Sequence, residues 1–254
     1  MRRPRLLDLF CCEGGASMGY HRAGFEVVGV DLFKHRDEAG KRVGFSRSRY
    51  PFPSAQRDAL GVLTMLLSGA PIPFECDGDD LLYGLDELDV IAASPPCQAY
   101  SITKHSHHIE HPALIEPVRE LLVRTGKPYV IENVEGAPLL SPLRLCGSEF
   151  NLSTMDDNGR RLRLQRHRRF ESNVMLLGNG GCQHDRSVQV GGAYGGGSVD
   201  RARTSKVRKR GGYTPSRAAR ARLLGVDWMT QAGMSQAIPP IYTQFIGEQL
   251  LDAL

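Results

Sequence analysis

Long apolar runs are absent from this 254-residue sequence, so we expect no membrane-spanning helix, which needs about 20 mostly apolar residues. A secretory leader is not expected either, because Asp8 interrupts the apolar stretch after the basic start and no small-residue cleavage site follows it. Hydrophobic residues make up 41% and charged residues 24%, a balance that is typical of a globular chain and excludes a disordered one. The length suits one large domain, alone or with a small appendage.

Cysteine is too sparse for a disulfide scaffold, with six residues in the whole chain. Two of them are adjacent and the others stand alone, without the paired spacing that marks zinc motifs: Cys11, Cys12, Cys76, Cys97, Cys146 and Cys182. The sequence therefore predicts free thiols, a reducing cytoplasmic compartment and no bound metal.

Acidic residues are scarce between residues 160 and 222, where 16 lysines and arginines accompany only 3 acids, a local net charge of +13. The rest of the chain has 16 basic and 25 acidic residues, a net charge of −9. A basic block beside an acidic body indicates a polyanionic partner, nucleic acid first. A solvated basic surface without a partner is the alternative.

Strands and helices alternate along most of the chain. Apolar runs that predict strands lie at 5–10, 26–31, 88–93 and 128–131. Segments with helical spacing lie at 16–23, 55–67, 114–124, 216–224 and 241–254. The first two strands flank the first helix, which makes a βαβ unit and therefore a parallel sheet. We predict an α/β fold with a doubly wound, mostly parallel sheet.

Glycine is concentrated in one region, with ten among the 35 residues 178–212, and few large apolar residues accompany them. Such a segment cannot build a core of its own. We therefore predict three parts: 1–171 for catalysis and cofactor binding, 172–213 as a small basic recognition region, and 214–254 as helices that return to the first part. For residues 34–80 the sequence suggests no chemical role.

Polar or reactive groups follow four of the predicted strands: Phe10–Gly15, Asp31, Ser94–Gln98 and Glu132–Asn133. In an open parallel sheet, ligands bind beyond the carboxyl ends of the strands. A glycine-containing turn before a helix lets the backbone approach a ligand, and Asp31 can accept hydrogen bonds from ribose hydroxyls. Together they indicate an adenosine-containing ligand, with a purely structural turn as the alternative.

Cys97 and Glu132 are the candidate reactive groups. Two prolines fix the backbone before Cys97 and can present its thiol in a cleft, whereas an isolated cysteine is more often buried and inert. Glu132 lies beyond a buried strand, where core packing does not explain a carboxylate. It can act as a general acid, bind the donor edge of a base, or pair with an arginine; Gln165 and Arg169 are the candidates to orient it.

Three motifs stand in the order found in a known enzyme family: Ser94-Pro95-Pro96-Cys97-Gln98, Glu132-Asn133-Val134 and Gln165-x-His167-x-Arg169. The sequence resembles the DNA cytosine-5 methyltransferases, especially their short phage and prophage members. The turn from Asp8 to Gly15 is similar to the S-adenosylmethionine loop of that family, and the stretch 238–247 is similar to its last motif. The resemblance implies a Rossmann-like methyltransferase fold and a location in the cytoplasm of a bacterial host cell.

The resemblance also implies roles for individual residues. Cys97 would add to ring position 6 of a flipped-out cytosine, and Glu132 would hold the ring and protonate N3, so that position 5 accepts the methyl group. The rest of the implied catalytic set is Gln98, Asn133 and Arg169. The implied cofactor residues are Phe10, Cys12, Glu13, Gly14, Gly15, Asp31, Leu32, Asp79, Pro95 and Ile238. The expected nucleic-acid contacts are Ser101, Gln165, His167, Lys206, Arg208, Lys209 and Arg210.

The expected partners are double-stranded DNA and a small-molecule methyl donor, S-adenosylmethionine or a modified form of it, with a cognate restriction enzyme left open. Three features depart from the family pattern. Cys12 stands where the family has glycine, which costs about 1 kcal/mol if the backbone φ is positive. His167 stands where the family has arginine, and the recognition region 172–213 is shorter than usual.

Three alternative functions remain at this stage. A tRNA cytosine-5 methyltransferase would share every catalytic residue. A nucleic-acid-binding homologue without catalysis would fit the departures at Cys12 and His167. A dinucleotide-dependent oxidoreductase would fit the fold, but it does not explain Pro96-Cys97-Gln98 together with Glu132-Asn133.

Overall fold

The computed structural model describes residues 2–33, 35–36, 42–76, 78, 80–100, 112–193 and 213–254. Six of the residues with predicted roles lie outside this set: Asp79, Ser101, Lys206, Arg208, Lys209 and Arg210. Among the described helices, none is long and apolar enough to cross a membrane.

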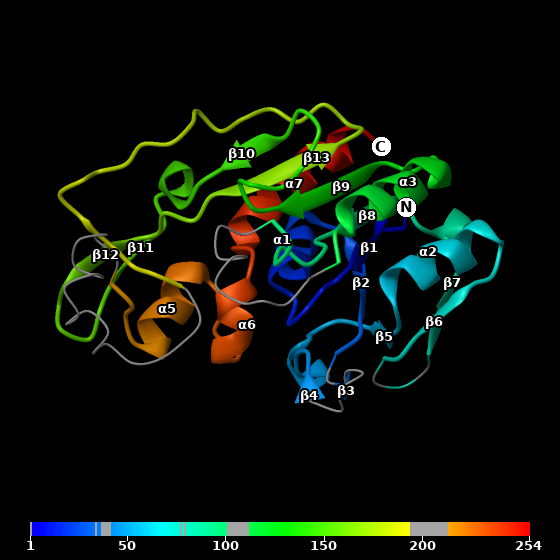
Figure 1. Ribbon diagram of the computed structural model, residues 1–254, viewed down its shortest axis with the longest axis horizontal. Helices are drawn as coiled ribbons and strands as arrows, with labels where there is room; N and C mark the ends of the chain where they lie inside the picture. Colours follow the sequence, from blue (N-terminus) through cyan, green and yellow to red (C-terminus); the bar gives the residue numbers. More distant parts are fainter. Residues whose placement is uncertain are drawn as a thin grey trace.

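A seven-stranded sheet occupies the centre of the molecule, in the order β10-β13-β9-β8-β1-β2-β5 (Figure 1). Its strands are β1 (Arg5–Leu9), β2 (Glu26–Asp31), β5 (Ser54–Gln56), β8 (Val90–Ala93), β9 (Tyr129–Asn133), β10 (Leu143–Leu145) and β13 (Arg168–Ser172). The run from β5 to β9 is parallel, whereas β13 and β10 pair antiparallel. The predicted mostly parallel α/β sheet is therefore confirmed.

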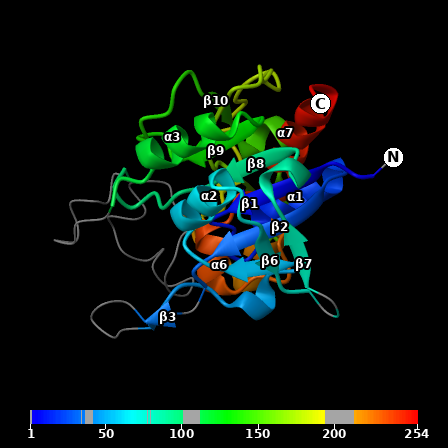
Figure 2. The same cartoon turned by 90° about the vertical axis from the view of Figure 1, so that its right-hand side faces the viewer.

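Helices cover both faces of this sheet. On these faces lie α1 (Gly15–Ala23), α2 (Ala59–Leu67), α3 (Ile115–Thr125) and α7 (Pro240–Asp252). Two further helices, α5 (Arg217–Leu224) and α6 (Gln231–Gln236), pack in a separate cluster. Leu7 and Leu9 of β1 pack with α2 and α3, and Leu6 packs on the opposite face with α1 and α7. Figure 2 shows α1 and α2 on either side of β1. Burial on both faces explains why the central strands are apolar runs without alternation.

A smaller sheet lies at one end of the molecule, in the order β11-β12-β14. Its strands are β11 (Ser153–Met155), β12 (Arg161–Arg163) and β14 (Gln189–Val190). Leu164, at the end of this sheet, packs with Leu223 of α5 and Met234 of α6 in a separate apolar cluster. The small sheet draws strands from both sides of residue 172, and the three-part division of the chain stays a prediction.

Short elements complete the described part of the chain. Two hairpin-like pairs are β3 (His35–Arg36) with β4 (Arg42–Val43) and β6 (Ile72–Phe74) with β7 (Leu81–Tyr83). Single 3₁₀ turns are η1 (Arg47–Arg49), η2 (Leu85–Glu87) and η4 (Gly147–Phe150).

The predicted helix at 55–67 begins later than expected. Residues 54–56 form β5, and α2 begins at Ala59. Asp58 caps the helix, because its carboxylate accepts a hydrogen bond of 2.7 Å from the N–H of Gly61. The start of α2 is therefore set by this cap and by pairing of β5 with β2, neither of which apolar spacing records.

Gly19 allows α1 and α7 to touch. A Cβ at this position would lie 2.0 Å from Thr243 Oγ1 and 2.1 Å from the Pro240 carbonyl oxygen. Thr243 could change its rotamer, but the carbonyl belongs to the backbone of α7. The same threonine donates a hydrogen bond of 2.9 Å to the Ala16 carbonyl, which fixes the two helices at this close approach.

Replacing Gly19 by alanine should therefore lower the free energy of unfolding by about 1–3 kcal/mol, the usual cost of overpacking. The cost of overpacking should exceed the gain of about 1 kcal/mol that replacing glycine by alanine normally brings inside a helix. Gly61→Ala is the matched control. A Cβ at this position would lie 3.4 Å from its nearest neighbour, Asp58 Oδ2, so this substitution should leave the free energy of unfolding unchanged or raise it. Urea denaturation measures both. A Gly19→Ala protein as stable as the parent would contradict the close-packing argument.

Candidate active site

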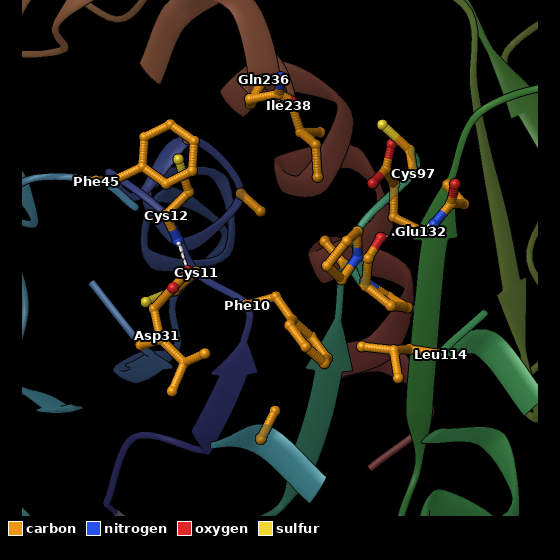
Figure 3. A pocket seen from close by; sticks show the side chains of 18 of the residues that line it. Phe10, Cys11, Cys12, Asp31, Phe45, Cys97, Leu114, Glu132, Gln236 and Ile238 are labelled. Atoms are coloured by element: carbon orange, nitrogen blue, oxygen red, sulfur yellow. Dashed lines mark hydrogen bonds between the residues drawn. The ribbon is translucent and has the colours of Figure 1, made fainter. Parts of the chain in front are cut away.

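The carboxyl ends of β1, β2, β8 and β9 open into one cavity of about 350 Å³ (Figure 3). The predicted residues that line it are Phe10, Cys12, Gly15, Asp31, Leu32, Pro95, Cys97, Gln98, Glu132, Asn133 and Ile238. Figure 3 shows Cys12 and Asp31 on one side of the cavity and Cys97 and Glu132 on the other, with Phe10 between them. Two chemically distinct halves therefore share one space.

The segment from Gly44 to Ala59, for which the sequence suggested no role, contributes part of the cavity wall through Phe45, Arg57 and Asp58. Residues 44–54 have no regular period, so the sequence alone does not indicate that this stretch reaches the site.

A buried hydrogen-bonded chain joins this segment to the first strand. The Tyr50 hydroxyl lies 3.0 Å from Ser17 Oγ, and Ser17 donates to the carboxylate of Asp8, which is fully buried. Burial raises the pKa of Asp8 to about 7, and the hydrogen bond from Ser17 limits the rise.

The turn after β1 has an unusual backbone. Phe10, Cys12 and Gly14 have φ angles of 62°, 54° and 84°, all in the left-handed region. Asp31, at the end of β2, stabilises this turn, since its Oδ2 accepts a 2.8 Å hydrogen bond from the Cys12 N–H. Its Oδ1 accepts a 3.2 Å bond from the N–H of Phe33. The carboxylate thus ties the two strand ends together and also lines the cavity.

Glu13 is not among the residues that line the cavity, and its predicted cofactor role stays a prediction. Its buried carboxylate accepts hydrogen bonds of 2.7 Å from both the N–H and the hydroxyl of Thr230, the residue that caps α6. Its carbonyl accepts a third bond of 2.7 Å from Trp228 Nε1. Gly14 is also absent from the lining, and its positive φ and its contact with Tyr50 explain the glycine instead. Glu13 and Gly14 therefore stabilise the conformation of the turn.

The backbone at Cys12 has the positive φ at which a non-glycine residue is strained. Cys12→Gly should therefore raise the free energy of unfolding by about 0.5–1 kcal/mol, the relief of left-handed strain less the added chain entropy. Cys76→Gly is the control, because Cys76 is exposed and is not among the described residues with positive φ. It should be neutral or destabilising. Thermal melts of the two variants test the difference, and equal changes would remove the strain argument.

Cys97 stands just after β8, at the rim of the second half of the cavity. The Asn133 side-chain amide donates a buried 2.8 Å hydrogen bond to the Pro95 carbonyl, and Asn133 Oδ1 accepts one of 2.9 Å from Val134 N–H. Asn133 therefore fixes the turn that carries Cys97. Burial raises the pKa of the Cys97 thiol, the positive charge of Arg168 opposes this, and the negative charge of Glu132 adds to it.

Glu132 ends β9 and is 7% exposed. Arg168 Nε lies 2.8 Å from its Oε1, but the N–H is poorly aligned, so this contact is an ion pair and leaves the buried Oε1 without a directed hydrogen bond. Burial raises the pKa of Glu132, and the charges of Arg168 and Arg166 lower it. The carboxyl group is thus buried, near positive charge, and still able to bond a ligand.

The arginine that pairs with Glu132 is Arg168 and not the predicted Arg169. Phe170 lies opposite Glu132 in the antiparallel pair of β13 and β9, so Arg168, two residues away, shares its face. Arg169 lies opposite Asn133 and points to the other side, where its Nε is buried without a hydrogen bond. A one-residue slip in reading a strand exchanges its faces.

The other two residues of the third motif also lie away from the cavity. Gln165 Oε1 accepts a hydrogen bond of 3.0 Å from Arg163 and does not reach Glu132. His167 Nδ1 lies 3.3 Å from Glu135 Oε2. Neither residue lines the cavity, so their predicted nucleic-acid contacts stay predictions.

Comparison with known proteins gives related methyltransferases. No family model matches the chain. It is 27% identical over 143 residues to the Type II methyltransferase M.XorII of Xanthomonas oryzae pv. oryzae, a match that covers 54% of this chain and only 29% of that protein. A solved E. coli structure, described as a prophage-encoded DNA modification methyltransferase, matches 98% of this chain and 99% of that one, with a TM-score of 0.51 and 13% identity.

The chain shares the fold of this prophage-encoded protein, with helices around a mostly parallel central sheet. The comparisons with the Xanthomonas and E. coli proteins confirm the resemblance to DNA methyltransferases that the motifs indicated. A methyltransferase of Entamoeba histolytica, EhMeth, is also similar over 100% of this chain and 99% of its own, with a TM-score of 0.48 and 11% identity.

Proposed function

We propose that this methyltransferase-like chain is a DNA cytosine-5 methyltransferase, which transfers a methyl group from S-adenosylmethionine to ring position 5 of a flipped-out cytosine. The observation that carries the proposal is that Cys97, at the end of β8, and Glu132, at the end of β9, line the same cavity. Carbon 5 of cytosine is a weak nucleophile until a thiolate adds to the ring and its charge is relieved. A thiol and a buried carboxyl group side by side supply both requirements.

The first half of the cavity fits S-adenosylmethionine. Asp31 offers carboxylate oxygens to ribose hydroxyls, the backbone at Gly15 is open to the cavity, and Phe10, Leu32 and Ile238 provide apolar contact. The cavity volume also lies within the range of small-molecule sites, about 300–1,000 Å³. When bound, S-adenosylmethionine supplies an electrophilic methyl group on its sulfonium.

The second half of the cavity supplies the chemistry on the base. The Cys97 thiolate forms a bond to carbon 6, while Glu132 gives a proton to N3 as the ring takes up the electron pair. Carbon 5 then bonds the methyl carbon as the bond between that carbon and the sulfonium sulfur breaks, which leaves S-adenosylhomocysteine. Loss of the proton from carbon 5 to water, breakage of the bond between carbon 6 and the Cys97 sulfur, and return of the N3 proton to Glu132 restore the aromatic ring and release Cys97 as a thiolate.

The pKa directions suit these two roles. Burial raises the pKa of Glu132, which favours the acid form that donates the proton. The positive charge of Arg168 opposes the rise in the pKa of Cys97 that burial causes, which favours the thiolate. The target base must leave the duplex, because stacking covers its ring face. We assign DNA binding to the basic block 160–222, where phosphate contacts would supply affinity.

Cys97→Ser should abolish methyl transfer while the protein stays folded, because a hydroxyl is a far weaker nucleophile than a thiolate. Duplexes containing 5-fluorocytosine should form a covalent adduct with the wild-type protein only, since fluorine blocks the last proton loss. Transfer of tritium from labelled S-adenosylmethionine and denaturing gels measure the two effects. Cys76→Ser, which alters an exposed cysteine outside the cavity, is the control and should behave like the wild type.

The choice of substrates separates the alternatives. The assay should include several DNAs and a tRNA pool, followed by bisulfite mapping of the product. Methylation of tRNA alone would establish the RNA-directed alternative. Tight DNA binding without transfer, by a protein that binds S-adenosylmethionine, would favour a homologue that has lost catalysis.

Arg168→Ala should move both limbs of the pH profile of kcat/KM to higher pH, by roughly one unit. Removing the positive charge raises the pKa of Cys97, so the thiolate forms only at higher pH. It also raises the pKa of Glu132, so this carboxyl group keeps its proton up to a higher pH. Arg168→Lys should retain most of the original profile. Arg169→Ala, assayed at equal folded fraction, should leave the pH profile unchanged. A shifted profile for Arg169→Ala, with no shift for Arg168→Ala, would instead assign the pairing with Glu132 to Arg169.

A further inference from the structure

Four side chains of metal-binding type meet outside the cavity. Cys146 follows β10, His167 precedes β13, and Cys182 and His184 lie in the segment between β13 and β14. One ligand atom from each lies within 4.8 Å of all the others. None of the four lines the cavity described above. They belong to three separated stretches of the chain, so the sequence carries no paired metal motif.

The distances suit tetrahedral coordination. Cys146 Sγ lies 3.3 Å from His184 Nε2, and Cys182 Sγ lies 3.3 Å from His167 Nε2. In a tetrahedral zinc site with bonds of about 2.3 Å to sulfur and about 2.0–2.1 Å to nitrogen, the sulfur–nitrogen edge is about 3.6 Å. These two sulfur–nitrogen distances therefore lie within a few tenths of an ångström of the tetrahedral edge, and the other pairs of ligand atoms lie within 4.8 Å of each other.

The outer nitrogens of both imidazoles have partners of their own. His167 Nδ1 lies 3.3 Å from Glu135 Oε2, and His184 Nδ1 lies 3.1 Å from the Gln165 side-chain amide. The Glu135 carboxylate can accept a hydrogen bond from His167 Nδ1, which orients the ring and leaves the Nε2 lone pair for the ion. The atom that His184 Nδ1 meets is Gln165 Nε2, a donor, so metal binding through His184 Nε2 requires the Gln165 amide to turn and present its oxygen to Nδ1. The rings stack with centroids 5.4 Å apart, and each Nε2 lies 3.3 Å from one of the two sulfurs.

We propose that Cys146, His167, Cys182 and His184 bind one structural zinc ion. Two thiolates and two imidazoles form a donor set that zinc favours, and their charges balance Zn²⁺. Four protein ligands leave no open position, so the site is structural and not catalytic. The proposal stands independently of the methyl-transfer reaction.

The ion would hold the segment 173–193 against the edge of the central sheet. This segment contributes little to the core: Met175 is 82% and Leu177 is 63% exposed. Gly180 and Gly181 have φ angles of 79° and 82° and turn the chain directly before Cys182. A metal here supplies the cohesion that apolar packing does not, because its binding energy is available only to the folded arrangement.

The ion would also fix the beginning of β13. His167 is the neighbour of both Arg166 and Arg168, whose charges act on Glu132. A histidine between two arginines then has a separate purpose: it serves the metal, while Arg168 beside it lines the cavity.

The test is the metal content of the full chain, purified without a histidine tag under reducing conditions from zinc-supplemented cells. Mass spectrometry of the metals should find about one zinc per chain. Cys146→Ser, Cys182→Ser and His184→Asn should each lose most of it. Cys76→Ser and His21→Asn, which alter exposed residues of the same types elsewhere, should retain it.

A second measurement uses the wild-type chain alone, so it holds even if the ligand variants fail to fold. Cobalt added to the chelator-stripped protein should give the strong visible absorption of a tetrahedral sulfur–nitrogen site, and zinc should abolish it. Chelation should also lower the melting temperature. Wild-type protein that contains no zinc and gives no such absorption, or that contains a Cys146–Cys182 disulfide, would overturn the proposal. Absence of methyl transfer would not affect it.

Discussion

Parallel pairing of β2, β1, β8 and β9 brings their four carboxyl ends to one edge of the sheet, and the candidate site depends on this constraint. Each strand contributes one kind of chemistry: the left-handed turn after β1, Asp31 after β2, Cys97 after β8 and Glu132 at the end of β9. No other part of the described chain has to be arranged for these groups to meet. The remaining elements hold this edge in shape or close the cavity over it.

The sheet also explains how charge is distributed in the cavity. Glu132 and Arg168 come from adjacent antiparallel strands, so backbone pairing places the two residues on the same face of the sheet, and their side chains meet there with Nε 2.8 Å from Oε1. A site built in this way keeps its electrostatic arrangement before any substrate arrives, which is the condition for preorganised stabilisation of charge.

Local patterns were sufficient for the centre of the fold. The strands β1, β2, β8 and β9 and the helix α1 were predicted because each is a short apolar run with a turn or an acid at its end. The same strand ends identified Cys97, Glu132 and Asp31 as cavity residues. For these elements, the adjacent residues in the sequence determine the environment of each residue, so one sequence is enough to predict that environment.

Prediction from the sequence was wrong or incomplete where contacts between residues far apart in the chain determine what a side chain reaches. Arg168 and Arg169 are adjacent, and only the register of β13 on β9 determines which of them reaches Glu132. The Glu13 side chain accepts hydrogen bonds from Thr230, 217 residues away, a contact that no local pattern indicates. The segment around Phe45 has no pattern of its own and becomes a cavity wall through tertiary packing.

The contacts between the first turn and the C-terminal part have a consequence for the order of folding. The turn meets Thr230 through Glu13, and a Cβ at Gly15 would lie 2.7 Å from the Ile238 carbonyl, which closes the cavity on this side. Such contacts have nearly the greatest sequence separation the chain allows, and long-range contacts form late. During synthesis β1, α1 and β2 emerge well before Ile238, so the cavity lacks this wall until Ile238 has left the exit tunnel.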